Sequence, residues 1–281
     1  MRGSTIWRVL VAAVAVTVLG GSLGACVLTG DDKDGAAGTS AGDASGGSSD
    51  QPKKPGDAKV EPGVVKGRVV GTDGKPIANA EIVVDNQLLY DSNLVLATDA
   101  HGEYRAELPP IAATYRVTAS FKTSYEGEKA TFPLAPDDDA AFAGNQGAVR
   151  DFTWKLTGKR DDMPDMYYGG SVTYYLGATN PVDDSYADSA NVRLMLTPVG
   201  PLVDGSAGKP VTTEPEQTGN GWEVRDVPVG RYRITAVYAA DGRRQPLKVQ
   251  LRNSGKPFAA EVTAVFENEL DHYRIELELK F

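Results

Sequence analysis

The chain of 281 residues has a single cysteine, Cys26, and only two histidines, His101 and His272. One thiol cannot form an intramolecular disulfide, so no disulfide framework holds the folded region together. Zinc sites draw on several cysteine and histidine ligands, which this sequence does not supply. From residue 64 onward, no serine stands in a Gly-x-Ser-x-Gly nucleophile elbow. We therefore expect no metal, no cofactor and no enzymatic activity.

Basic residues are also scarce, because 29 lysines and arginines stand against 38 acidic residues, for a net charge of −9. A protein of this charge has no electrostatic footprint for nucleic acid. A long apolar run is absent too: the uncharged stretch Val9–Leu19 is about half the roughly 20 residues that a membrane-spanning helix needs. With Arg2 and Arg8 before it and small residues after it, the stretch is typical of a secretory signal peptide over residues 1–25.

One aliphatic and two small residues, Leu23, Gly24 and Ala25, directly precede Cys26. This arrangement resembles the lipobox of bacterial lipoproteins. The resemblance implies cleavage before Cys26, acylation of the new N-terminus and anchoring at the extracytoplasmic face of the cell membrane. Two or more acyl chains anchor a protein stably. The alternative is an ordinary cleaved signal peptide followed by an unmodified thiol.

Residues 26–63 contain almost no large apolar side chain and consist mainly of Gly, Ala, Ser, Asp, Lys and Pro. Such a segment cannot bury enough apolar surface to offset the entropy lost on ordering. We therefore expect a disordered tether between the lipidated cysteine and the folded region. A flexible chain of about 38 residues has a root-mean-square reach of roughly 35 Å.

From residue 64 onward, short runs alternate apolar and polar residues, with Gly and Pro at the turns between them. The segment Tyr115–Phe121 (YRVTASF) closely matches Tyr232–Tyr238 (YRITAVY). These patterns predict an all-β fold of two tandem antiparallel β-sandwiches with Greek-key order. Their expected ranges are residues 64–158 and 165–281, the second a divergent repeat of the first.

The first range carries a fuller pattern, which combines a glycine-led strand, a Gly-x-Pro turn, a small residue before the next strand and Thr-Asp-x-x-Gly-x-Tyr. Its positions are Gly67, Gly74, Pro76, Ala80, Thr98, Asp99, Gly102 and Tyr104. The pattern resembles the carboxypeptidase regulatory-like domain. That resemblance implies the transthyretin (prealbumin) fold and an accessory module without catalytic activity of its own. The second range departs from the pattern, because Trp222 stands in place of Tyr104.

Aromatic rings near the start of the second range are candidates for a ligand face, namely Tyr168, Tyr175 and Tyr186. The strand alternation turns Val172 and Tyr174 toward the core, so Tyr175 points outward. Exposed rings of this kind often line ligand sites. Packing at a strand end is the alternative explanation for the same tyrosines.

Three acidic clusters, at residues 137–139, 161–165 and 183–188, are the candidates for calcium binding. Calcium takes six to eight oxygen ligands, often from carboxylates in loops. None of the clusters has the spacing of an EF-hand. Solvated loop charge is the simpler explanation for them.

These patterns together predict a membrane-anchored cell-surface lipoprotein with a non-catalytic binding or scaffolding role. Its expected partners are the membrane, through the lipid anchor, and an envelope protein or polysaccharide, without nucleic acid. The alternative function is that of a carbohydrate-binding module for a cell-wall or extracellular polysaccharide, which requires Tyr175 and its neighbours to be exposed.

Overall fold

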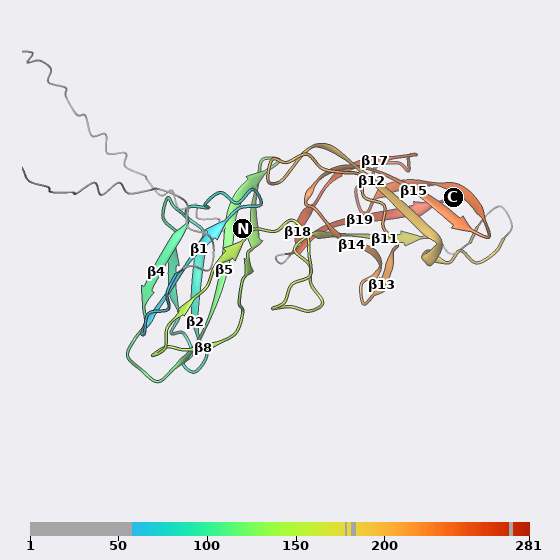
Figure 1. Cartoon of the computed structure of the whole chain (residues 1–281). Helices are drawn as coiled ribbons and strands as arrows, with labels where there is room; N and C mark the ends of the chain where they lie inside the picture. Colours follow the sequence, from blue (N-terminus) through green and yellow to red (C-terminus); the bar gives the residue numbers. More distant parts are fainter. Residues whose placement is uncertain (1–57, 178, 181–183, 270–271) are drawn as a thin grey trace, which may run out of the picture. The chain divides into compact units, whose positions relative to one another are not determined.

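The computed structural model describes residues 58–177, 179–180, 184–269 and 272–281. Its regular structure is almost entirely β-strand, arranged in three sheets (Figure 1). Within these ranges the helical structure is one 3-10 turn, η1 (Ser189–Asn191), and no helix is long and apolar enough to cross a membrane. The predicted signal peptide, the lipobox with Cys26 and most of the predicted tether lie outside the described residues.

The first sandwich consists of β1 (Val64–Val70), β2 (Glu81–Asn86), β3 (Leu94–Ala97), β4 (Glu103–Glu107), β5 (Thr114–Tyr125), β6 (Glu128–Pro133), β7 (Ala135–Pro136), β8 (Phe142–Ala143), β9 (Ala148–Val149) and β10 (Phe152–Thr153). One sheet has the order β4-β1-β10-β7, with β9 beside β1. The other has the order β3-β2-β5-β6, with β8 beside β5. Most pairs are antiparallel, while β1 runs parallel to β9 and β10.

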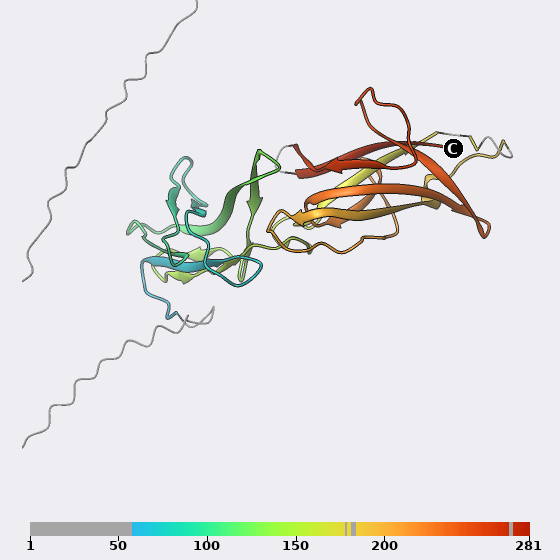
Figure 2. The ribbon, with the colours of Figure 1, turned by 90° about the horizontal axis from the view of Figure 1, so that it is seen from above.

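The second sandwich consists of β11 (Gly170–Leu176), β12 (Val192–Leu202), β13 (Glu216–Thr218), β14 (Gly221–Val227), β15 (Gly230–Ala240), β16 (Arg243–Leu251), β17 (Val262–Val265), β18 (Glu267–Glu269) and β19 (His272–Lys280). They form one path, β12-β15-β16-β19-β11-β14-β13, and Figure 2 shows these yellow-to-red strands stacked over one another. β16 joins the two layers, because it pairs with β15 as far as Leu247 and with β19 from Lys248 onward. Strands that bend from one sheet into the next make such corners. The predicted all-β fold of two tandem sandwiches is therefore confirmed.

Both sandwiches pair their main strands in the same way. The first strand, β1 or β11, is antiparallel to β4 or β14 and parallel to the last strand, β10 or β19. The second strand pairs with the fifth in both, and the matching segments lie on β5 and β15. Tyr115 and Tyr232 begin these segments and are both fully buried. Descent of the two sandwiches from one repeated unit stays a prediction.

The core follows the alternation that the sequence shows. On β19, every second residue is apolar, and these side chains are all buried: Tyr273, Ile275, Leu277 and Leu279. In the first sandwich the ring of Trp154 is buried between Phe121 and Phe132, with ring centroids 5.1 and 5.5 Å away. Burial of one such side chain contributes about 1.5–3 kcal/mol, so the apolar faces of the strands are the main source of stability.

The residues of the family-like pattern hold a turn together. The carboxylate oxygen Oδ1 of Asp99 accepts hydrogen bonds from the backbone N–H groups of His101 and Glu103, each at 2.8 Å. Gly102 follows with φ +73°, and a Cβ at this position would lie 2.5 Å from the carbonyl oxygen of Val69. Asp99 and Gly102 thus hold the backbone of this turn in shape.

Candidate functional site

A groove of about 710 Å³ lies over the outer face of the sheet formed by β2, β5 and β6. Alternation along a strand places every second side chain on this face. Its lining is mixed: apolar side chains alternate with polar and charged ones, and β2 and β5 contribute Glu81, Asp85, Arg116, Thr118 and Lys122. Lys122 pairs with Glu81 across the two strands at 2.8 Å.

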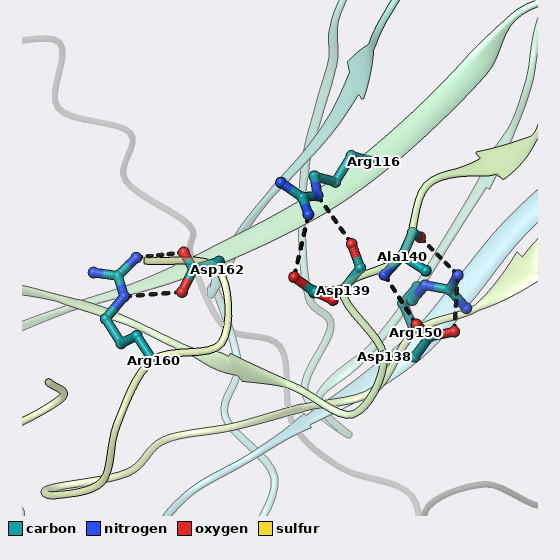
Figure 3. A network of polar contacts seen from close by, with 7 residues as sticks. All are labelled: Arg116, Asp138, Asp139, Ala140, Arg150, Arg160 and Asp162. Carbon is teal, nitrogen blue, oxygen red and sulfur yellow. Dashed lines mark hydrogen bonds and ion pairs between the residues drawn. The ribbon is translucent and has the colours of Figure 1, made fainter. Parts of the chain in front are cut away.

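One wall of the groove comes from the segment between the two sandwiches. Arg160 holds Asp162 through two hydrogen bonds, from Nε to Oδ1 at 3.0 Å and from Nη2 to Oδ2 at 2.6 Å (Figure 3). This contact with Arg160 lowers the pKa of Asp162 below its ordinary value. The backbone N–H of Arg160 also donates to the carbonyl of Met166 at 3.0 Å, which turns the segment back on itself. Met163 stands exposed at the rim.

The acidic cluster at residues 137–139 is held by arginines of the first sandwich (Figure 3). Arg116 donates from Nε to the carbonyl of Asp139 at 2.9 Å and from Nη2 to its carboxylate at 3.1 Å. Arg150 pairs with the carboxylate of Asp138 at 3.1 Å and donates to the carbonyl of Ala140 at 2.9 Å. The cluster is therefore fastened to the sheet by arginine side chains. In the part of the chain that the structure describes, no group of three or more His, Cys, Asp or Glu side chains is placed to hold a metal ion.

This arrangement suits recognition of a ligand by hydrogen bonds and charge. The arginine–carboxylate pairs are internal, so the side chains that form the walls are fixed before a ligand arrives. Guanidinium groups stay protonated and donate hydrogen bonds, so these arginines position the carboxylates and do not act as general bases. The groove can bind a partner through hydrogen bonds and charge.

Tyr175 lies outside the core, as the strand alternation predicted, and is 39% exposed. One face of its ring is covered, because the guanidinium carbon of Arg252 lies 3.8 Å from the ring centroid. Contacts of this kind are cation–π interactions. A flat ligand that stacks on this face must first displace Arg252.

The other two predicted ligand-face residues differ sharply from each other. Tyr186 is 79% exposed, in the loop after β11. Tyr168 is only 7% exposed, and its burial raises the pKa of its hydroxyl to about 12. The cationic groups of Lys155 and Arg160 lie over its ring at 5.7 and 5.9 Å. The segment before Tyr168 packs over its ring, so the ring is covered, and a ligand face that includes Tyr168 stays a prediction.

A contact between Ser171 and His272 was not predicted from the sequence. The hydroxyl oxygen of Ser171 lies 3.0 Å from Nε2 of His272, where β11 and β19 begin side by side. Burial lowers the pKa of His272 below 6.5. The two residues are 101 positions apart, and only the parallel pairing of the first and last strands brings them together. No local sequence signal marks that pairing.

The comparisons with known proteins cover the folded region. The profile of the carboxypeptidase regulatory-like domain matches residues 64–143, so the resemblance named from the sequence is confirmed for the first sandwich. Among curated proteins, none matches the chain.

Three solved structures are examples of chains with weak structural similarity to this protein. The TIE protein of Bacillus anthracis has 11% identity over 78% of this chain and 34% of that chain, with a TM-score of 0.31. A streptococcal ancillary pilin has 13% identity over 76% and 61%, with a TM-score of 0.24. A C-terminal fragment of the pilus adhesin SpaC from Lactobacillus rhamnosus GG has 10% identity over 78% and 97%, with a TM-score of 0.24. The chain thus spans about a third of the first and under two thirds of the second, and values this low transfer no function.

Proposed function

We propose that this protein is a lipid-anchored, non-catalytic protein of the extracytoplasmic membrane face that binds or scaffolds an envelope protein. The observation that carries the binding role is the groove over β2 and β5, whose walls are fixed in advance by the arginine–carboxylate pairs of Figure 3. A preorganised surface loses little conformational entropy when a partner binds. The groove is open to solvent, and three of its charged pairs are internal (Lys122–Glu81, Arg116–Asp139 and Arg160–Asp162), which suits a partner with mixed polar groups.

A catalytic role has weaker support than binding. The Ser171–His272 contact is the nearest approach to a nucleophile and base in the described ranges, but the Ser171 side chain is buried in the sheet. An acyl-transfer site also needs an orienting group on the other ring nitrogen and donors for an oxyanion. The contact is better explained as the satisfaction of a buried hydroxyl.

The anchor is proposed from the sequence at Leu23–Cys26. If the thiol carries the lipid, Cys26→Ser should move the protein from the membrane fraction to the soluble extracytoplasmic fraction. Thr29→Ser is the matched control, because it changes a hydroxyl side chain just beyond the lipobox. Retention of Cys26→Ser in the membrane fraction at the level of the control would rule out thiol-linked anchoring.

The groove is tested by crosslinking in intact cells. A photoreactive residue in place of Met163, at the rim, should give a discrete protein adduct. Thr118→Arg fills the floor with a long side chain and should reduce that adduct at least tenfold. The control Thr263→Arg places the same side chain at an exposed position on β17 of the second sandwich and should leave the adduct unchanged. Equal adducts in both variants would mean that the groove is not the binding site.

Carbohydrate binding is the second candidate function, and the exposure of Tyr175 and Tyr186 favours it. Purified cell-wall polysaccharide should then retain the protein, and Tyr175→Ala should weaken retention. Arg252→Ala gives a sharper test, because it uncovers the Tyr175 ring and should strengthen stacking on a sugar. If neither variant changes retention, Tyr175 is not part of a sugar site.

A further inference from the structure

The loop between β2 and β3 exposes three large apolar side chains in a row. Leu88 is 64% exposed, Leu89 is 51% exposed, and Tyr90 is fully exposed. Single exposed apolar residues are common on protein surfaces, whereas contiguous ones mark sites of interaction. The loop tip is therefore a candidate interaction surface of the first sandwich.

The loop is held in shape by a buried side chain. Asn86 is buried, and its Oδ1 accepts hydrogen bonds from the backbone N–H groups of Leu88 and Leu89 at 3.0 and 3.1 Å. The backbone N–H of Asn86 in turn donates to the Oδ1 of Asn93 at 3.2 Å. These bonds satisfy the loop backbone locally, so the apolar side chains are presented outward on a defined turn.

A second apolar loop lies at the same end of the sandwich. The backbone N–H of Gln87 donates to the carbonyl of Thr114 at 2.8 Å, which places the β2–β3 loop beside the β4–β5 loop. That second loop contains Pro109, Pro110 and the exposed Ile111. It lines a hollow of about 700 Å³ whose lining residues carry no charged side chain.

The chain also enters the sandwich at this end. The carbonyl of Gly63 accepts a hydrogen bond from the N–H of Leu108 at 2.8 Å, and the exposed Val60 lies just before it. The opposite end of β5 meets the second sandwich, where the Tyr125 hydroxyl donates to the carbonyl of Pro201 at 3.0 Å. The 37 residues from Cys26 to Pro62 therefore lead into the same end that carries the apolar loops.

We propose that this apolar end, formed by Val60, Leu88, Leu89, Tyr90 and Ile111, docks on the lipid bilayer that carries the acyl chains of Cys26. This inference rests on the proposed lipid anchor. Leucine and tyrosine side chains suit the interfacial zone of a bilayer, where the tyrosine ring is apolar and its hydroxyl stays wet. Asp91 follows Tyr90 and is exposed, which limits the contact to that shallow zone.

If Cys26 is anchored in the membrane, a weak contact between the apolar end and lipid is enough for docking. Linking a second binding element to an anchored chain turns its binding into an intramolecular event, with an effective concentration on the order of millimolar for flexible linkers. The loops therefore need only modest affinity for lipid to spend most of their time on the surface. Docking would place the apolar end of the first sandwich against the membrane surface, and the end that contacts the second sandwich would face away from it.

The single native cysteine allows a direct test with the full chain. Tyr90→Cys and the control Tyr186→Cys each add one exposed thiol. The processed protein is reconstituted in vesicles of phosphatidylcholine and phosphatidylglycerol that also contain nitroxide-labelled lipid. The added thiol is then labelled with a fluorophore. We expect nitroxide quenching at least threefold stronger at position 90 than at position 186. Leu88→Ser with Leu89→Ser should return the position-90 signal to the level of the control.

Each outcome bears on one proposal. Equal quenching at positions 90 and 186 overturns membrane docking, as does a position-90 signal that the serine pair leaves unchanged. Membrane docking is also overturned if the fluorophore at position 90 becomes shielded from water as the protein concentration rises, without quenching by nitroxide. That result would assign the apolar end to contact with a second copy of the protein. Labelling of the unsubstituted protein would show that Cys26 is a free thiol, which contradicts the lipid anchor separately from the docking.

Discussion

The two sandwiches share their central strands and differ at their edges. The third strand pairs with the second in the first sandwich, as β3 with β2, but with the fourth in the second sandwich, as β13 with β14. The second sandwich is also closed by β16, which belongs to both layers, while the first keeps two separate sheets. The central β5 and β15 segments thus set the core, and edges and loops are free to vary. The apolar end of the first sandwich lies in such loops, and the groove combines the outer face of β2 and β5 with a wall from the segment around Arg160.

The matching core tyrosines show the same contrast at the level of single atoms. The hydroxyl of Tyr232 donates to the carbonyl of Pro228 at 2.8 Å. The hydroxyl of Tyr115 is buried and has no hydrogen-bond partner among the described residues. At matching positions, the buried tyrosine hydroxyl therefore has a hydrogen-bond partner in the second sandwich and none among the described residues in the first.

The largest expected effect is confined to the first sandwich. A Cβ on Gly67 would lie 1.8 Å from the carbonyl oxygen of Arg150, so Gly67→Ala forces β1 away from its neighbour. We expect a loss of about 3 kcal/mol in the free energy of unfolding, measured by chemical denaturation. Gly177→Ala, after β11, is the control, because no atom lies within 4 Å of its added Cβ. A Gly67→Ala protein as stable as the control would contradict the strand packing.

The next effect concerns the contact between the sandwiches. Tyr273 stacks on Phe132 with centroids 4.7 Å apart, and its hydroxyl bonds the backbone N–H and carbonyl of Thr131 at 3.0 and 3.1 Å. Tyr273→Ala should cost about 3 kcal/mol and separate the melting transitions of the two sandwiches. Tyr273→Phe keeps the stacking and should cost about 1 kcal/mol. Coincident transitions in Tyr273→Ala would show that this contact does not couple them.

Removing the two matching tyrosine hydroxyls should change the free energy of unfolding in opposite directions. Tyr232→Phe leaves the carbonyl of Pro228 without its donor and should cost about 1 kcal/mol. Tyr115→Phe removes a buried unpaired hydroxyl and should be neutral or stabilising by up to about 1 kcal/mol. Thermal unfolding of both variants measures the difference. Equal losses would mean that the two tyrosines are in equivalent surroundings.

The smallest effect is the pH dependence of the second sandwich. Burial lowers the pKa of His272 below 6.5, so the unfolded chain binds a proton more readily than the folded chain. Stability should therefore fall as the pH drops from about 6.5 through the lowered pKa of His272. In the first sandwich, backbone hydrogen bonds lower the pKa of Asp99, and that contribution is lost only below pH of about 4.

Substitution isolates this histidine. His272→Gln should flatten the pH dependence of the second transition between pH 7 and 5, while His101→Gln in the first sandwich should leave that dependence in place. An unchanged profile in His272→Gln would assign the dependence to another group.

The sequence predicted what local patterns encode. Alternation identified β5, β15 and β19 with their buried faces, and the outward direction of Tyr175, because the strand period acts on neighbouring residues. The groove could not be predicted, because its wall forms where the segment around Arg160 folds back over a sheet. The burial of Tyr168 depends on the same folding back of this segment, and the Ser171–His272 contact depends on the parallel pairing of β11 with β19.

The proposed attachment through Cys26 underlies the proposed location and the proposed docking of the apolar end. The most direct measurement is the intact mass of the protein extracted from the membranes of its own cells. We predict the mass of a chain that begins at Cys26 and carries a diacylglyceryl group, with or without a further acyl chain. A mass equal to an unmodified chain, whether uncleaved or cleaved elsewhere, would contradict the lipid anchor.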